Sequence, residues 1–320
     1  ESVAGGVLYW GIPEYRLPKD VLAKEVKAIE QSGVSIHCNV RVGETISFEA
    51  LKSQSDAVYV AIGTQQSRTL GIPGEDLPGV ENGLIFLKRI GLKQNFTVPE
   101  RLIVIGGGST AMDVARTAVR LGSKEVTVVY RRTEREMPAG AEEIQEAREE
   151  GIRIITLASP VRIMERGGAV CGIELVKRQL TDYGSDGRRR SAHIEGSEFV
   201  LECDGIITAI NQDVDHKFHQ TTQLDFDGKG RIDVHQFTSR TSEEGVFAGG
   251  DTSPWGANVA VNAIADGKKA AVNIDKYLGG SGELNMGEWM EIPVIPDMEV
   301  TEPHMRFPVR TLPVDERIDN

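Results

Sequence analysis

The chain has 320 residues, of which 40% are hydrophobic and 26% charged, the balance of an ordinary globular protein with room for two domains. Its net charge of −12 argues against nucleic acid and anionic membranes as partners, because both need a basic surface. No apolar run approaches the ~18 residues of a membrane span, and no signal peptide is recognisable. The three cysteines and six histidines form no metal or iron–sulfur motif, so we predict no metal site and a cytoplasmic location.

The first hundred residues alternate turn-rich stretches with short regular elements. Residues 1–18 are rich in Gly and Pro and predict a loop. Gly33 suits the position just after a helix, and Gly63 stops a buried strand. The predicted elements are a helix over 21–32, a strand over 34–40, a helical turn over 48–53, a strand over 56–62 and, beyond a turn-rich stretch at 70–80, a helix over 83–94.

A strand, a glycine turn and a helix follow one another from residue 101. Four apolar residues, 102–105, run into three consecutive glycines, and an amphipathic stretch begins at Ser109. Gly106, Gly108 and Ala111 fill the three positions of the dinucleotide fingerprint. Glycine allows a close backbone approach to a pyrophosphate, and the helix N-terminus offers unpaired N–H groups. The pattern predicts a nucleotide-binding βαβ unit.

The next strand, 126–130, ends in two arginines. An NAD site carries Asp or Glu at this point to bind the ribose 2′-hydroxyl, whereas this chain has Arg131 and Arg132. Two guanidinium groups suit a 2′-phosphate, because Arg forms bidentate, charge-assisted hydrogen bonds with phosphate oxygens. A plain solvated strand end is the alternative interpretation. The pattern favours NADP(H).

The stretch after Arg132 predicts one helix and then a set of strands. Residues 142–150 should form a helix whose acidic face is solvated. The motif DGIITAI at 204–210 predicts a buried strand and echoes DAVYVAI at 56–62, as two nucleotide-binding domains of one design would. Four segments, with a turn at 183–187, read as strands of an antiparallel meander: 152–157, 161–165, 170–180 and 189–202.

The C-terminal third opens on a second strand and turn. Residues 246–248 predict a short strand, and a sharp turn follows that ends in the Asp251 carboxylate. Residues 258–278 predict an amphipathic helix. From about residue 280 the sequence is rich in Gly, Ser, Pro and charge without periodicity, so we expect an irregular tail over 281–320.

Four motifs carry a resemblance to a known family. The chain resembles the pyridine-nucleotide–disulfide oxidoreductase superfamily and, within it, the glutamate synthase small-subunit family, with the related parts of dihydropyrimidine dehydrogenase and ferredoxin:NADP oxidoreductases. The motifs are GGVLYWGIPEYRLP at 5–18, GGGSTAMDVARTAVRLG at 106–122, VTVVYRRTEREMPA at 126–139 and GVFAGGDTSPWGANVAVNAIADGKKAA at 245–271.

The resemblance implies an α/β fold of two Rossmann-like, three-layer dinucleotide-binding domains. The NADPH domain, 99–241, would be inserted in a truncated FAD domain made of residues 1–98 and 242–280. A first FAD-binding strand and an iron–sulfur region would lie upstream of Glu1, and further sequence beyond residue 320. We therefore expect a piece of a longer protein, and we expect this piece alone to bind FAD weakly or not at all.

The resemblance also implies cofactor contacts. Pyrophosphate would lie on Gly107, Gly108, Ser109 and Thr110, and the 2′-phosphate on Arg131, Arg132 and Arg135. The strand end beside the nicotinamide nucleotide is Ala209, Ile210 and Asn211. FAD would contact Glu1 at its adenosine ribose, Asp251 at its ribityl chain, and also Gly6, Val7, Gly63 and Gly250. Ala257, Asn258 and Val259 would lie against the isoalloxazine, where a positive helix end stabilises anionic reduced flavin.

The function that the resemblance implies is hydride transfer from NADPH to FAD. Such chemistry needs aligned rings rather than a side-chain acid or base. Electrons would pass through iron–sulfur clusters, held upstream or in a partner, to the large subunit of glutamate synthase in a hetero-oligomer. Two alternatives stay open: the same module serving another acceptor, such as ferredoxin or a pyrimidine, and a nucleotide-binding scaffold without turnover.

Overall fold

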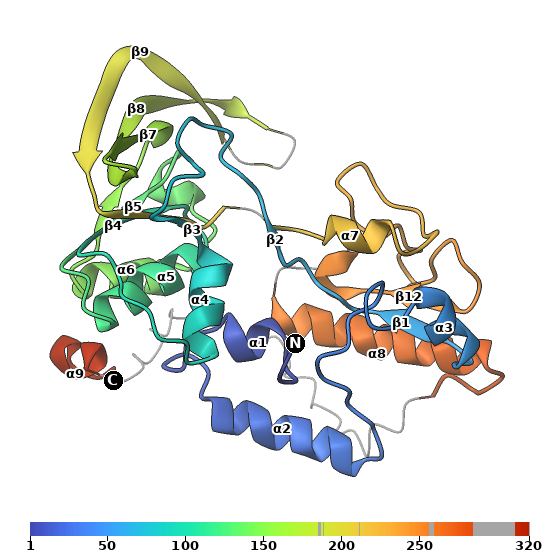
Figure 1. Cartoon of the computed structure of the whole chain (residues 1–320). Coiled ribbons are helices and arrows are strands. Elements are labelled where there is room, and N and C mark those ends of the chain that lie inside the picture. Colours follow the sequence, from blue (N-terminus) through green and yellow to red (C-terminus); the bar gives the residue numbers. More distant parts are fainter. Residues whose placement is uncertain (185–186, 188, 211, 256–258, 284–310, 320) are drawn as a thin grey trace, which may run out of the picture.

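The computed structural model describes residues 1–184, 187, 189–210, 212–255, 259–283 and 311–319 (Figure 1). Three hydrophobic cores organise them. Two cores line opposite faces of one parallel sheet, and the third surrounds a separate pair of parallel strands. The predicted α/β class, with two units built on parallel strands, is confirmed.

The larger unit is built on a five-stranded parallel sheet in the order β3-β10-β4-β5-β6. One prediction is wrong here. Residues 152–157 were expected in the antiparallel meander, but β6 pairs parallel with β5, because a helix crosses over between them and returns the chain to the same edge. The strands are β3 (Val80–Asn82), β4 (Arg101–Ile105), β5 (Glu125–Val129), β6 (Arg153–Ile155) and β10 (Gly205–Thr208).

Alternation along β4 gives this sheet two buried faces. Leu102 and Val104 belong to the core under the helices, whereas Ile103 and Ile105 belong to the core on the opposite face. Helices cover the first face and a three-stranded antiparallel sheet covers the second, so the unit has three layers (Figure 1). The helices are α4 (Gly83–Gly91), α5 (Ser109–Arg120) and α6 (Ala141–Glu149); the antiparallel strands are β7 (Ala158–Arg166), β8 (Ala169–Tyr183) and β9 (Arg189–Glu202).

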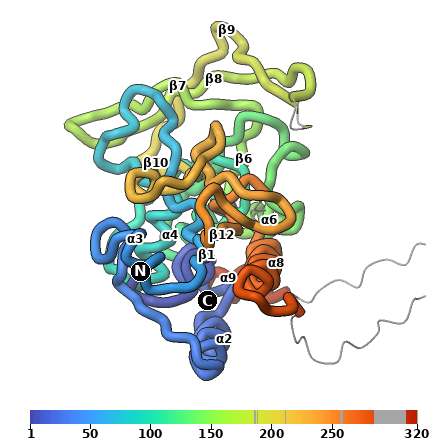
Figure 2. Tube along the Cα trace, turned by 90° about the vertical axis from the view of Figure 1, so that its right-hand side faces the viewer, coloured from blue at the N-terminus to red at the C-terminus, as the bar shows by residue number. Residues whose placement is uncertain are grey.

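The smaller unit is built on one parallel pair, β1 (Val58–Val60) and β12 (Val246–Ala248). Its core combines these strands with Phe48, Phe218 and Ile232, which come from three distant parts of the chain. Figure 2 shows α2 at the opposite end of the molecule from β7–β9, as Figure 1 does. The helices of this region are α1 (Val7–Trp10), α2 (Lys19–Gln31), α3 (Phe48–Ser53), α7 (His216–His219) and α8 (Ala260–Tyr277).

Two chain crossings connect the units. β2 (Gln66–Ser67) and β11 (Gln212–Asp213) run antiparallel side by side, and Arg68 donates two hydrogen bonds of 2.7 Å to Asp213. The predicted domain boundaries, after residues 98 and 241, do not coincide with this division. β3 joins the large sheet ahead of the first boundary, and Phe218 joins the small core ahead of the second, because strand pairing and burial, not motif spacing, decide where each segment packs.

Two further expectations are corrected. Residues 34–40 form no strand, because no described strand runs beside them; the Asn39 N–H instead donates to the Glu1 carbonyl at 2.7 Å. The tail is not irregular throughout: α9 (Val314–Ile318) docks through Arg317, which pairs with Glu149 at 2.7 Å. No helix among the described residues has the length and apolarity to cross a membrane.

Candidate functional site

The turn after β4 is shaped by close contacts that only glycine permits. A Cβ on Gly106 would lie 2.3 Å from the Ala209 carbonyl oxygen, and one on Gly107 would lie 2.5 Å from the ring of Tyr130. Gly108 has room, since the nearest atom, in Pro138, would be 4.0 Å away. The structure therefore brings the predicted strand end at Ala209 directly against the glycine turn.

The start of α5 presents unused hydrogen-bond donors. Gly108 is its N-cap, and no side chain caps the helix. Within the described chain, the N–H groups of Ser109 and Thr110 have no acceptor, as expected for the first turn of a helix. The positive end of the α5 dipole adds to them. Ala111 is fully buried, so α5 lies close to the sheet. This arrangement fits a pyrophosphate.

The segment after β5 is held beside the turn by its own hydrogen bonds. The Ala139 N–H donates to the Gly107 carbonyl at 3.1 Å, and the Tyr130 hydroxyl donates to the Glu136 carbonyl at 2.7 Å. Thr133 and Glu136 form a capping box around η1 (Glu134–Glu136). The T-x-x-E pattern at 133–136 was the signal in the sequence that could have identified this rigid wall.

The arginines after β5 differ in exposure. Arg131 and Arg135 face solvent, whereas Arg132 is only 8% exposed. The Arg132 carbonyl accepts from the N–H of Leu157, which has a left-handed backbone (φ 53°) that is strained for a residue with a branched side chain. The Leu157 carbonyl in turn accepts from the Arg178 N–H at 2.7 Å. These bonds join the end of β5 to β8.

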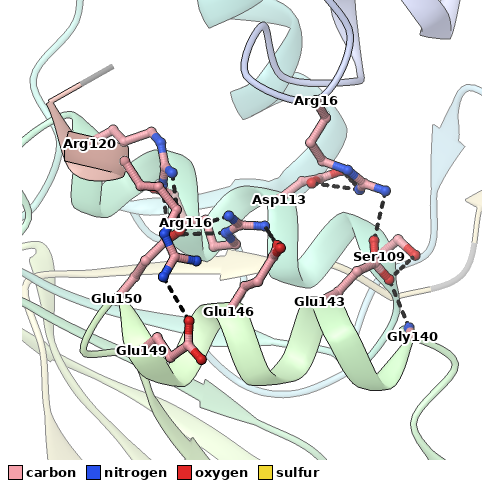
Figure 3. Close-up of polar contacts among 11 residues, drawn as sticks. Arg16, Ser109, Asp113, Arg116, Arg120, Gly140, Glu143, Glu146, Glu149 and Glu150 are labelled. Atoms are coloured by element: carbon pink, nitrogen blue, oxygen red, sulfur yellow. Dashed lines mark hydrogen bonds and ion pairs between the residues drawn. The ribbon is translucent and has the colours of Figure 1, made fainter. Parts of the chain in front are cut away.

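An ionic network lies behind the glycine turn (Figure 3). Arg16, from the N-terminal motif, donates through Nη1 to both carboxylate oxygens of Asp113 at 2.8 Å, and its Nη2 lies 2.8 Å from Glu143 Oε1. Glu143 Oε2 accepts from the Ser109 hydroxyl at 2.9 Å and from the Gly140 N–H at 2.8 Å. The network fastens the motif at 5–18 to α5 and α6. Burial raises the pKa of Asp113 to about 6, although the Arg16 hydrogen bond and charge lower it.

A second set of ion pairs, between Glu150 and α5, corrects part of the prediction that the acidic face of 142–150 is solvated: Glu142 and Glu149 are exposed as predicted, but Glu150 is not. The Glu150 side chain is fully buried, and its two oxygens lie 2.7 Å from Arg116 and Arg120 of α5. Burial raises the pKa of Glu150, but hydrogen bonds from Arg120 and Arg116 outweigh it and hold the pKa below its usual range. The Tyr15 ring lies over both guanidinium groups, at 4.9 and 4.0 Å. Helix packing thus places these acids opposite bases, which the sequence of α6 alone does not show.

The second cluster of predicted residues lies at the carboxyl edge of β1 and β12. Gly63 follows β1, and Gly250 and Asp251 begin η2 (Gly250–Thr252) after β12. Asp251 Oδ1 is buried and has no hydrogen-bond partner among the described residues, and burial, with the charge of Asp266, raises the pKa of this carboxyl. An unpartnered buried acceptor fits the hydroxyls of a ribityl chain. Ligands of open α/β sheets bind at this edge.

The remaining predicted residues are spread more widely. The Glu1 carboxylate accepts from Lys88 of α4 at 2.6 Å, and Gly6 (φ 54°) is the N-cap of α1, which starts at Val7. Val259 is the N-cap of α8 and is 53% exposed. Ile210 follows β10 and Ala209. Asn211, Ala257 and Asn258 lie outside the described residues. Among those described, no group of three or more His, Cys, Asp or Glu could hold a metal.

Comparison with known proteins gives several relatives that share most of this chain. The NADP(+)-dependent formate dehydrogenase subunit beta of Moorella thermoacetica is 41% identical over 86% of this chain and 39% of its own length. The NADPH-Fe(3+) oxidoreductase subunit beta of Geobacter sulfurreducens is 34% identical over 96% and 49%. The glutamate synthase [NADPH] small chain of Escherichia coli is 34% identical over 86% and 61%. The chain thus spans 39% to 61% of these relatives.

Two solved structures share the fold. Mycobacterium tuberculosis FprA in complex with NADPH matches with a TM-score of 0.69 at 21% identity, over 86% of this chain and 75% of that one. T. acidophilum thioredoxin reductase matches with a TM-score of 0.63 at 22% identity, over 87% and 88%. The family model of pyridine nucleotide-disulphide oxidoreductases matches residues 13–267. The resemblance seen in the sequence is confirmed, and the chain belongs to the pyridine nucleotide-disulphide oxidoreductase family.

Proposed function

We propose that this chain is the NADPH- and FAD-binding part of an oxidoreductase that passes electrons to an iron–sulfur partner protein. The observation that carries the proposal is the glycine turn at 106–108. There, unpaired N–H donors at the start of α5 adjoin a wall from which Arg131 and Arg135 reach solvent. This combination of donors and cations fits a dinucleotide with a 2′-phosphate. In this proposal Arg132, which is buried, supports the wall.

The second half of the proposal places FAD at the carboxyl edge of β1 and β12. Asp251, with its unpartnered buried oxygen, would accept from the ribityl hydroxyls. The first turns of α8 lie beside η2, since the Gly250 N–H donates to Asp266 at 3.0 Å, so the positive dipole end of the helix would face the isoalloxazine. Glu1, Gly6, Val7 and Gly63 complete the proposed contacts.

The proposed reaction needs no side chain to act as an acid, a base or a nucleophile. When bound, the nicotinamide supplies a hydride and the flavin accepts it, so the protein has to align two rings and exclude water. The three cysteines are unpaired, and burial raises the pKa of Cys203 to about 12, which keeps that thiol unreactive. We therefore propose electron transfer through the flavin rather than through a dithiol.

The acceptor is the finer part of the proposal. We propose a small subunit of the glutamate synthase type, in a cytoplasmic hetero-oligomer with a large electron-accepting subunit. The same module with another acceptor is the second candidate. The observation behind the second candidate is the 41% identity to a formate dehydrogenase subunit beta, beside 34% to the Escherichia coli glutamate synthase small chain.

An anaerobic titration tests the cofactor part. The purified chain would be incubated with FAD, freed of excess, and titrated with NADPH or NADH while the visible flavin absorbance is followed. Bleaching by NADPH, and much less by NADH, is the expected result. The Arg131→Ala variant should weaken NADPH binding by about 1.5–3 kcal/mol, because one charge-assisted phosphate contact is lost, and leave NADH unchanged.

Two results would contradict the proposal. If Arg131→Ala weakened the binding of NADPH and NADH equally, Arg131 would not be a contact of the 2′-phosphate. A chain that binds NADPH but, even with FAD bound, transfers no hydride would favour the alternative of a nucleotide-binding scaffold.

A further inference from the structure

A pocket lies beside the segment that packs against the nucleotide turn, and one of its walls comes from outside the sequence motifs. We propose that the β8–β9 hairpin forms this wall of the NADP(H) site, with Arg189 contacting the 2′-phosphate and Tyr183 covering the adenine. The inference rests on the proposed function, because it concerns the adenosine end of the same dinucleotide. It adds a specificity-determining residue that lies 58 residues beyond Arg131 in the chain.

The pocket has a volume of about 390 Å³ and lies between the wall after β5 and the hairpin. One side includes Arg135, Glu136, Met137 and Pro138, and the other Leu180, Tyr183 and Arg189. The Glu136 carboxylate is held by the N–H and hydroxyl of Thr133. A Cβ built on Gly108 would lie 4.0 Å from Pro138, and the Ala139 N–H is bonded to the Gly107 carbonyl. The segment that lines the pocket therefore also packs against the turn expected to hold the pyrophosphate, so the adenosine end is the part of the nucleotide that would reach the pocket.

The chemistry of the lining matches a base and a phosphate. Met137, Pro138 and Leu180 are apolar, and the aromatic ring of Tyr183 is 72% exposed, as a stacking surface needs to be. Arg135 and Arg189 form no ion pair with any side chain in the described ranges. Two guanidinium groups that have no carboxylate partner among the described side chains, one on each side of a pocket, favour a bound anion.

The hairpin is held in place at the end of β5. Arg178 of β8 bonds to the Leu157 carbonyl through its N–H, and its side chain donates to the hydroxyls of Ser191 and Ser159 at 2.8 and 3.0 Å. Burial lowers the pKa of Arg178, and the positive charge of the nearby Arg131 lowers it further. Arg131 therefore lies near the hairpin. Its positive charge and that of Arg189 would both attract one anion.

Strand geometry provides a matched control. Tyr183 and Arg189 are directly paired across the hairpin, so their side chains share one face. Arg190, the next residue in β9, points to the opposite face and is exposed. Arg189→Ala and Arg190→Ala remove the same charge from the same strand, but only the first removes it from the pocket.

The test is equilibrium binding of two probes to the full chain by calorimetry: adenosine 2′,5′-bisphosphate and adenosine 5′-monophosphate. Arg189→Ala should weaken the bisphosphate roughly tenfold and leave the monophosphate unchanged, because one charged hydrogen bond is lost. Arg190→Ala should stay within about twofold of the wild type for both probes. Tyr183→Ala should weaken both probes by a similar factor.

A second variant separates binding from folding. Arg189 also donates to the Thr181 carbonyl at 3.1 Å, so Arg189→Gln keeps a donor there while removing the charge. This variant should bind the bisphosphate as weakly as Arg189→Ala does, and its melting temperature should be unchanged. Equal effects of the Arg189 and Arg190 variants would overturn the inference alone. A wild-type chain that binds neither probe would overturn the proposed nucleotide site and the inference with it.

Discussion

The two parallel-strand units differ in how completely their strands are covered. In the large sheet, Val104 and Val128 are fully buried under the helices, and Ile173 of the antiparallel sheet is fully buried against the opposite face. Beside β1 and β12, α8 leaves Val261 69% and Ile264 57% exposed, and only Ala270 of that helix is buried. The glycine turn therefore stands on a closed three-layer scaffold. The turn at Asp251 stands on two short strands, so we expect the nucleotide unit to be the more stable of the two.

The largest effect is expected where the closed unit buries charge. Glu150→Gln removes the negative charge that neutralises Arg116 and Arg120 in a buried position. It should lower the free energy of unfolding, measured in urea, by about 3–5 kcal/mol. Glu100→Gln is the control. It breaks one exposed pair with Lys124 and should cost about 0.2–1 kcal/mol. Similar losses in both variants would mean that the buried network adds nothing to the stability of this unit.

The next effect concerns the turn itself. Gly106→Ala drives a Cβ against the Ala209 carbonyl and should cost about 1–3 kcal/mol of stability in thermal unfolding, since neither backbone can move away. Gly108→Ala has room and should fold normally. Its added methyl group would nevertheless face the expected pyrophosphate and weaken the binding of NADPH. Normal folding of both variants would show that the turn tolerates movement.

A smaller effect depends on pH. The pKa of Asp113 is raised from 3.8 to about 6 in the folded chain, so the native state binds this proton more readily than the unfolded state. Its contribution to stability is gained as pH falls through about 6 towards 4 and lost as pH rises, on the order of 2 kcal/mol. Asp113→Asn should flatten this part of the stability profile. An unchanged profile would contradict the assignment to Asp113.

The smallest effect is expected on the open unit. Ile264→Thr replaces an apolar side chain that is more than half exposed and should change the free energy of unfolding by less than about 0.5 kcal/mol. Val114→Thr, in the buried face of α5, should cost several times more, because its hydroxyl would lie in a core without water. A large loss at Ile264 would show that another part of the protein covers α8.

Local patterns were sufficient for much of the nucleotide unit. The apolar run before Gly106 and the helical spacing after it correctly predict β4 and α5, because both elements follow from backbone preferences within about twenty residues. The predicted helices near 21–32, 48–53, 83–94 and 258–278 also match α2, α3, α4 and α8, apart from residue 258, which is not described.

Long-range packing explains the failures. The acidic residues of α6 appear solvated until α5 places Arg116 and Arg120 opposite them. The direction of β6 depends on a crossover, and the strand expected over 34–40 depends on a neighbour that the described chain does not supply. A local pattern of charges or of β-forming residues does not indicate which distant segment will pack against it.

By itself, the sequence determined the glycine turn, the cationic end of β5 and the family, since each depends on residue types at short spacing. Only the tertiary structure decided that Arg132 is buried while Arg131 is exposed, that Arg16 is fastened behind the turn, and that a distant hairpin places Arg189 across a pocket from Arg135. These contacts join segments up to about a hundred residues apart, and their geometry follows from the layers that bury them.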